Sequence, residues 1–222
     1  THHIQKMKKN KVVRSLYMTL SVINFNIYEA EQSFELYKTI KKYISQLSKN
    51  TEFRLFFHVT LFRLLEYCIL IIAKIYEEPF NRYPNMSMKT ALEDLKNTPI
   101  SNKAMIYDFL QKKNRKYTGD IIKDIIDYFS KKNKRLDKKL EVLRDIRDKK
   151  IAHSEDGYTP PRLTFSQFEK SFKTLINHAK EFYETISDGI GHKYGVNGGS
   201  FIENVNAKSA SLSLKKLLNT IL

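Results

Sequence analysis

The chain has 222 residues, which is enough for one well-packed domain and short for two. Its 39 lysines and arginines outnumber its 24 aspartates and glutamates, so the formal net charge is +15, which favours contact with a polyanion such as nucleic acid or an anionic membrane surface. Cys68 is the single cysteine, which excludes an intrachain disulfide and a thiolate zinc cluster and fits a reducing cytoplasm.

The N-terminal part of the sequence predicts a leading helix or an arm, followed by an amphipathic helix. The apolar run of residues 12–27 is interrupted by Arg14, Ser15, Thr19 and Asn24, so it lacks the shape of a signal peptide and predicts a leading helix or an arm. From Glu29 onward, apolar residues recur at steps of three and four, which indicates one face of an amphipathic helix. These residues are Ala30, Phe34, Tyr37, Ile40, Ile44 and Leu47.

Residues 52–77 are the most apolar segment of the chain and leave almost no polar face. A helix that is apolar all round is buried, either in a core or in a membrane. The length would allow a membrane span, but Arg63, Glu66 and Lys74 would be costly at mid-bilayer. We therefore predict a central core helix, partly covered by a dimer partner, with Arg63 and Glu66 paired at a spacing of three.

The middle of the chain predicts two short helices and a long basic one. Ser87 is placed to cap a short helix, Pro99 to start another, and residues 112–116 form a basic link. A helix, or a broken pair of helices, then spans about residues 120–151, with the basic run of residues 131–135 as the candidate break. Its second half has an apolar face with residues at steps of four, three and four: Leu136, Leu140, Leu143 and then Arg147. Arg147 therefore occupies a position where this face predicts an apolar residue. A cation there needs a partner or a water-filled cleft.

The C-terminal part predicts an aromatic helix, a linker and a tail. A loop with Gly157 and Pro160 precedes Thr164, which is placed to cap a helix that presents a bulky aromatic face. The glycines from Gly189 onward lack the order of a phosphate-binding loop and predict a flexible linker, followed by a small tail helix over residues 211–222. We find no convincing strand and no internal repeat, so the sequence predicts an all-α fold.

Arg147 and His153 are the residues with the clearest chemistry. His153 lies at a predicted helix end, where the helix dipole favours the imidazolium and should raise its pKa. Arg147 offers a planar fork of donors suited to phosphate, so the two side chains could cleave RNA without a metal. The alternative is a helix C-terminus with a capping histidine and solvated basic residues. On an ideal α-helix the two residues lie about 120° apart, so the helix must fray near Ile151 or a partner chain must complete the site.

The segment Arg-Asp-Lys-Lys-Ile-Ala-His, from Arg147 to His153, resembles the R-x(4–6)-H signature of the HEPN superfamily. With the long apolar helix before it and the capped aromatic helix after it, the chain resembles the abortive-infection branch, the AbiU type, over residues 28–188. The resemblance implies an antiparallel helical bundle, a homodimer and a metal-independent endoribonuclease that acts as a toxin or antiphage effector. It makes Arg147 and His153 the catalytic pair, with Asp148 and Ser154 in support. Some relatives instead carry a tyrosine two residues beyond the histidine, where this chain has Glu155.

The resulting prediction divides the chain into an N-terminal helix or arm (residues 1–27), the HEPN-like domain (residues 28–188) and a linker with a tail helix (residues 189–222). The expected partners are a second copy, RNA and, by resemblance, a cognate antitoxin or nucleotidyltransferase. We expect a cytoplasmic location, no membrane, no metal and no cofactor, and a non-catalytic RNA- or protein-binding module is the alternative. His178 and His192 are isolated and predict surface roles. The predicted RNA-binding residues are Arg144, Lys149, Lys150, Lys131, Lys132, Lys134 and Arg135.

Overall fold

The computed structural model describes residues 11–49, 51–79, 85–98, 120–152, 164–194 and 209–221, and every regular element within those ranges is a helix. The all-α prediction is therefore confirmed. The elements, in chain order, are α2 (Lys11–Leu47), α3 (Thr51–Ile75), α4 (Met88–Lys96), α6 (Ile121–Ile146), the π-helix η1 (Arg147–Ala152), α7 (Phe165–Tyr194) and α9 (Ser209–Ile221).

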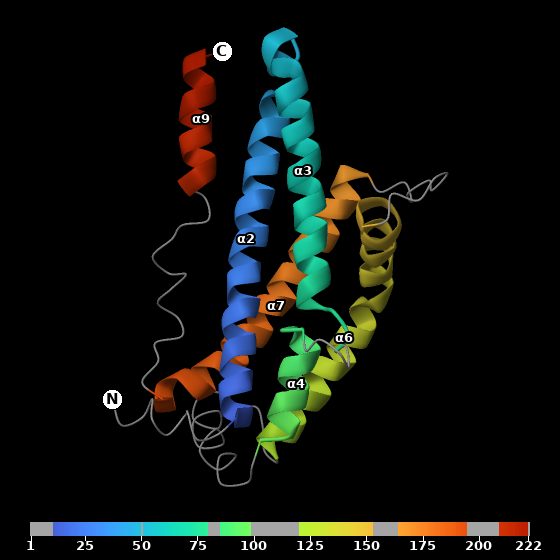
Figure 1. Ribbon diagram of the computed structural model, residues 1–222, viewed down its shortest axis with the longest axis vertical. Helices are drawn as coiled ribbons and strands as arrows, with labels where there is room; N and C mark the ends of the chain where they lie inside the picture. The colour runs from blue at the N-terminus through green and yellow to red at the C-terminus, as the bar shows by residue number, and fades with distance from the viewer. Residues whose placement is uncertain are drawn as a thin grey trace.

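Helix α2 organises the bundle because it contacts α3, α4, α7 and α9. Figure 1 shows α2 and α3 side by side and antiparallel, with α4 against α6 at one end of the molecule and α9 beside the other end of α2. The large core lies between α2, the C-terminal half of α3, α4, α6 and α7. A second, smaller core joins α2, α3 and α9 through Ile40, Leu47, Phe57 and Leu218.

The division of the N-terminal segment into a leading helix or arm and a second helix is wrong, since α2 runs without interruption from Lys11 to Leu47. Its buried stripe already begins at Leu16 and continues through Leu20, Ile23 and Ile27 at steps of four and three. Met18 and Phe25 are exposed on other faces of the same helix. These two apolar residues obscured the periodicity in the sequence.

Helix α3 has two different halves. Its C-terminal half is core, with Cys68, Ile72 and Ile75 fully buried, as predicted. Its N-terminal half leaves Leu55 and Phe56 mostly exposed, and the cover that we predict from a dimer partner stays a prediction. By length and composition alone Phe53–Ile75 could cross a membrane, with a mean hydropathy of 1.9. The predicted pair within it forms, with Arg63 Nη1 2.7 Å from Glu66 Oε2.

Helix α6 is one continuous helix, so the alternative of a broken pair is ruled out. Asp120 caps it by accepting a hydrogen bond from the backbone N–H of Lys123. The apolar stripe crosses the basic run because Asn133 takes the inward position between Phe129 and Leu136, while Lys131, Lys134 and Arg135 point outward. A basic run therefore interrupts only the outer face of this helix.

Helix α7 begins as predicted, with the Thr164 hydroxyl accepting from the backbone N–H of Gln167 at 3.3 Å. It continues to Tyr194, so Gly189 and Gly191 belong to a helix and the prediction that the linker begins there is wrong. A helix tolerates single glycines at a cost of roughly 1 kcal/mol each. The predicted tail helix is confirmed as α9, which packs on α2 through buried Leu218 and the bond from Tyr43 Oη to Asn219 Oδ1, 2.9 Å.

Candidate functional site

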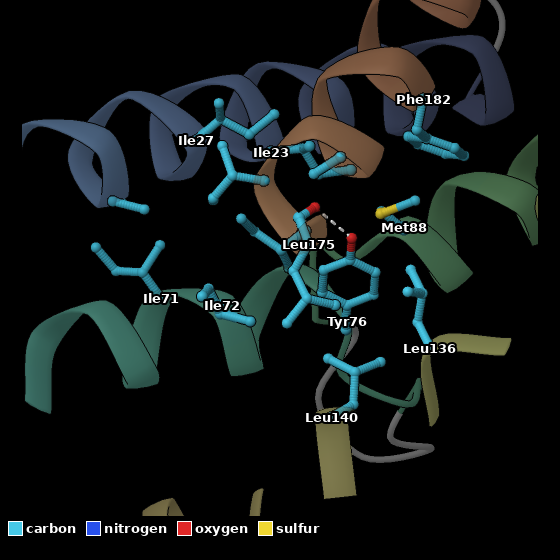
Figure 2. Close-up of a cluster of buried hydrophobic side chains, with 14 of the residues drawn as sticks. Ile23, Ile27, Ile71, Ile72, Tyr76, Met88, Leu136, Leu140, Leu175 and Phe182 are labelled. Carbon is cyan, nitrogen blue, oxygen red and sulfur yellow. Dashed lines mark hydrogen bonds between the residues drawn. The ribbon is translucent and has the colours of Figure 1, made fainter. Parts of the chain in front are cut away.

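The site region is built around the C-terminal end of α3, where Tyr76 enters the core. Figure 2 shows the Tyr76 ring among core side chains that include Ile72, Met88 and Leu140, with its hydroxyl bonded to the carbonyl oxygen of Leu175. The Tyr76 hydroxyl donates to that oxygen at 2.6 Å and lies 2.9 Å from Nδ1 of His178. Burial raises the pKa of Tyr76 well above its ordinary value, so the phenol stays protonated. Tyr76 thus ties the end of α3 to α7.

His178 is a core residue, and the prediction of a surface role for it is wrong. Its side chain is 3% exposed, stacks on Tyr76 and packs against Phe129. Because the single Tyr76 proton goes to Leu175, Nδ1 of His178 is the donor in the bond between the two side chains. Nε2 is then the unprotonated nitrogen, and it is buried without a hydrogen-bond partner. Burial first, and the charge of Lys132 second, lower the pKa of His178 to about 4.

Three consecutive residues at the end of α3 each contact a different element, and we call Tyr76, Glu77 and Glu78 the α3-end clamp. The Tyr76 carbonyl accepts a hydrogen bond from Arg144 Nη2 of α6 at 2.9 Å. Glu77 Oε1 accepts from Arg147 Nη1 of η1, and Glu78 pairs with Lys89 of α4. This clamp therefore fixes where α6 and η1 meet the end of α3.

Arg147 is the first residue of η1 and is held by two carboxylates. Its Nε donates to Asp148 Oδ1 at 2.6 Å, and its Nη1 lies 3.4 Å from Glu77 Oε1. The side chain is 21% exposed, so it is neither free in solvent nor sealed in the core. The expectation that a cation on this seam needs a partner is confirmed.

The helix does not fray at Ile151 as the sequence analysis allowed, because η1 carries helical backbone through Ala152. A π-helix is rare and often occurs at functional sites. His153 and Ser154 lie outside the described residues, so their meeting with Arg147 stays a prediction. The structure describes Asp148, and its carboxylate contacts Arg147 directly.

Two of the predicted RNA-binding cations form ion pairs within the chain. Lys149 Nζ lies 2.9 Å from Asp145 Oδ1, one turn earlier. Lys132 pairs with Glu181 and contacts Tyr128, and although burial lowers its pKa, these two partners outweigh burial and raise it. Lys132 is therefore bound to α7, which leaves it less available to a phosphate than its exposed neighbours.

Of the remaining predicted cations, three are exposed on α6. Arg144 donates to the α3-end clamp, and the backbone of Lys150 belongs to η1. A cleft of about 280 Å³ between α4 and α6 is lined by Lys89, Lys96 and Lys134 with Glu93 and Asp137. The exposed predicted cations of α6 are Lys131, Lys134 and Arg135. They could follow an RNA backbone, because each is directed to solvent.

Glu77 is a site residue that no pattern in the sequence indicated. It lies 70 positions before Arg147, so no local pattern links the two side chains. Only its position directly after a long apolar helix distinguished it in the sequence. Among the described residues no group of three or more histidine, cysteine or acidic side chains is arranged to hold a metal ion.

The fold and the site together define an all-helical protein with a partly buried arginine at the end of a core helix and a histidine six positions later in the sequence. The family model of AbiU2, a HEPN domain, matches residues 19–210. The chain belongs to this family of abortive-infection-associated HEPN domains, which confirms the resemblance. No curated protein and no solved structure matches the chain.

Proposed function

We propose that this protein is a metal-independent endoribonuclease that acts as a toxin or antiphage effector in abortive infection, through a composite Arg147–His153 site at a dimer interface. The observation that carries the proposal is the geometry of Arg147 in a chain of the AbiU2 family. A guanidinium kept partly buried at the end of a core helix is a fixed donor array, and such an array suits the phosphate of an RNA strand.

The proposed reaction is a transesterification within the RNA. His153 takes the proton of the ribose 2′-hydroxyl, whose oxygen attacks the adjacent phosphorus. The bond to the 5′-oxygen of the next nucleotide breaks, and that oxygen takes up a proton, which leaves a 2′,3′-cyclic phosphate and a 5′-hydroxyl. Arg147 holds the phosphate and offsets the negative charge that develops on it. A second His153, from a partner subunit, would supply the acid.

The exposed half of α3 supports the dimer. Leu55 is 74% exposed and Phe56 62% exposed, and Val59 and Phe62 are exposed one and two turns later. Large contiguous apolar surface on a soluble chain marks an interaction site. The α3-end clamp follows the other end of this helix, roughly 30 Å along its axis from Phe56, so a second copy has to extend along α3 to reach Arg147.

The test is cleavage of total RNA by the purified wild-type protein beside His153→Ala, both in EDTA. We expect the wild type to release fragments with cyclic phosphate ends and the variant to release none while its circular dichroism spectrum is unchanged. A strict requirement for magnesium, or equal cleavage by both proteins, would refute the nuclease proposal.

The alternative is a HEPN module that binds RNA or protein without cleaving. The exposed cations of α6 favour it, because they suit phosphate binding whether or not catalysis follows. In that case Arg147→Ala weakens binding and no cleaved product appears under any condition.

We also propose that the protein is cytoplasmic and does not contact a membrane, and that it has an antitoxin or a nucleotidyltransferase as a partner.

A further inference from the structure

Arg147 lies between two carboxylates that reach it by different routes. Asp148 is its neighbour in sequence, so this pairing is local. Glu77 comes from 70 positions away and meets Arg147 only because the end of α3 packs against η1. The two carboxylates and the guanidinium add up to one net negative charge, which opposes the approach of an RNA phosphate.

The two contacts differ in length and in the donors that they use. The Oδ1 atom of Asp148 lies 2.6 Å from Nε of Arg147, whereas Oε1 of Glu77 lies 3.4 Å from Nη1. Because Asp148 occupies Nε, a phosphate bound by two N–H groups of Arg147 would use Nη1 and Nη2, and Glu77 lies at Nη1. The Glu77 side chain is 39% exposed, so its carboxylate can turn into water when it leaves Arg147.

The position of Glu77 in the fold adds a second argument. It is the second residue after the C-terminus of α3, where the helix dipole places partial negative charge and disfavours a carboxylate. Arg147 offsets that charge in the protein without RNA. An incoming RNA phosphate would replace Glu77 as the partner of Arg147, and the Glu77 carboxylate would then be hydrated.

We propose that Glu77 occupies, in the RNA-free protein, the place on Arg147 that an RNA phosphate takes when the substrate binds. The inference rests on the proposed function, because it names Arg147 as the phosphate-binding group. Glu77 is then a competitor that lowers the affinity of the site until a strand with correctly spaced phosphates displaces it.

The experiment compares Glu77→Gln with Glu78→Gln in binding to a 2′-O-methyl RNA oligonucleotide, followed by fluorescence anisotropy at fixed salt. This probe cannot be cleaved, because its attacking hydroxyl is blocked. Both substitutions remove one negative charge from adjacent positions, but Glu78 pairs with Lys89 instead of Arg147. We expect Glu77→Gln to tighten binding about two- to five-fold more than Glu78→Gln does, the range for one partly exposed ion pair.

A second pair of variants tests whether the effect passes through Arg147. In an Arg147→Ala background, Glu77→Gln should change the affinity no more than Glu78→Gln does. Equal effects of the two glutamine variants on the wild-type background, or weaker binding by Glu77→Gln, would overturn the inference. If Glu77→Gln does not fold, Glu77→Asp provides the comparison, since its shorter side chain withdraws from Arg147 with the charge kept, and unchanged affinity then overturns the inference.

The proposed function fails in a different way. If the wild type neither binds nor cleaves RNA, or if Arg147→Ala leaves the affinity unchanged, the phosphate-binding role of Arg147 is lost and the inference falls with it. If Arg147→Ala weakens binding and the wild type cleaves, but Glu77→Gln matches Glu78→Gln, only the role of Glu77 is refuted.

Discussion

His178 is the residue whose environment departs most from what its sequence neighbourhood suggests. It is buried, donates from Nδ1 to Tyr76 and has no partner for Nε2. A proton on Nε2 would place a charge in the core with nothing to accept its hydrogen bond, which is why burial lowers the pKa to about 4. Lys132 adds repulsion, and Glu181 offsets part of it.

This environment predicts a loss of stability in acid. Between the ordinary histidine pKa of about 6.5 and the folded value of about 4, the unfolded chain binds a proton that the folded chain refuses, so stability falls as the pH falls through that window. The contribution is on the order of 3 kcal/mol. Urea unfolding at pH 7.5 and pH 4.5 should show a smaller difference for His178→Gln than for the wild type.

Helix α3 carries two adjacent phenylalanines in opposite environments. Phe57 is 6% exposed and belongs to the smaller core with Leu218 and Leu47, whereas Phe56 is 62% exposed. The hydrophobic contribution of a side chain to stability depends on the area that the fold removes from water, so the two rings should differ in effect although their chemistry is identical.

We expect Phe57→Ala to lower the free energy of unfolding by about 3–5 kcal/mol and Phe56→Ala by about 0.5 kcal/mol or less in dilute protein. Phe56→Ala should instead weaken self-association, since it removes apolar area from the proposed dimer surface. Urea titration and sedimentation velocity measure the two effects separately. A wild type that sediments as a monomer at every concentration would exclude this surface as a dimer interface.

The protein carries a formal net charge of +15, and the positions of its basic side chains determine which ligands they can contact. On α6 the exposed cations Lys131, Lys134 and Arg135 lie on the outer face of a continuous helix. If they follow an RNA strand, each neutralises a phosphate and releases counterions, which makes the affinity salt-dependent.

The double variant Lys134→Ala, Arg135→Ala should therefore reduce the slope of the logarithm of RNA affinity against the logarithm of salt concentration by about 1.4, as expected for two phosphate contacts to a single strand. The matched control is Lys170→Ala, Lys173→Ala, which removes two exposed charges from α7. The measurement is anisotropy at several salt concentrations. An equal reduction of the slope by both double variants would mean that the exposed cations of α6 are not a specific RNA-binding surface.

The sequence by itself determined that the protein is helical, where α4, α6 and α7 begin, and that Arg147 needs a partner. These are local properties, because helix periodicity and capping depend on residues within a few turns of each other. The continuity of α2 and α6 could have been inferred from the same periodicity, but exposed Met18 and Phe25 obscured the first, and Asn133 took an apolar position in the second.

Only the tertiary structure decided which partner Arg147 has, that His178 is buried, and that one half of α3 remains exposed. Each of these depends on which helix faces which, and the contacts join residues that are far apart in the chain, such as Glu77 with Arg147 and Tyr76 with His178. An apolar side chain is stabilised by burial against any surface that covers it. The sequence does not say whether the same chain or a partner supplies that surface. Packing decides that, and for Leu55 and Phe56 the helices of this chain supply no cover within the described residues.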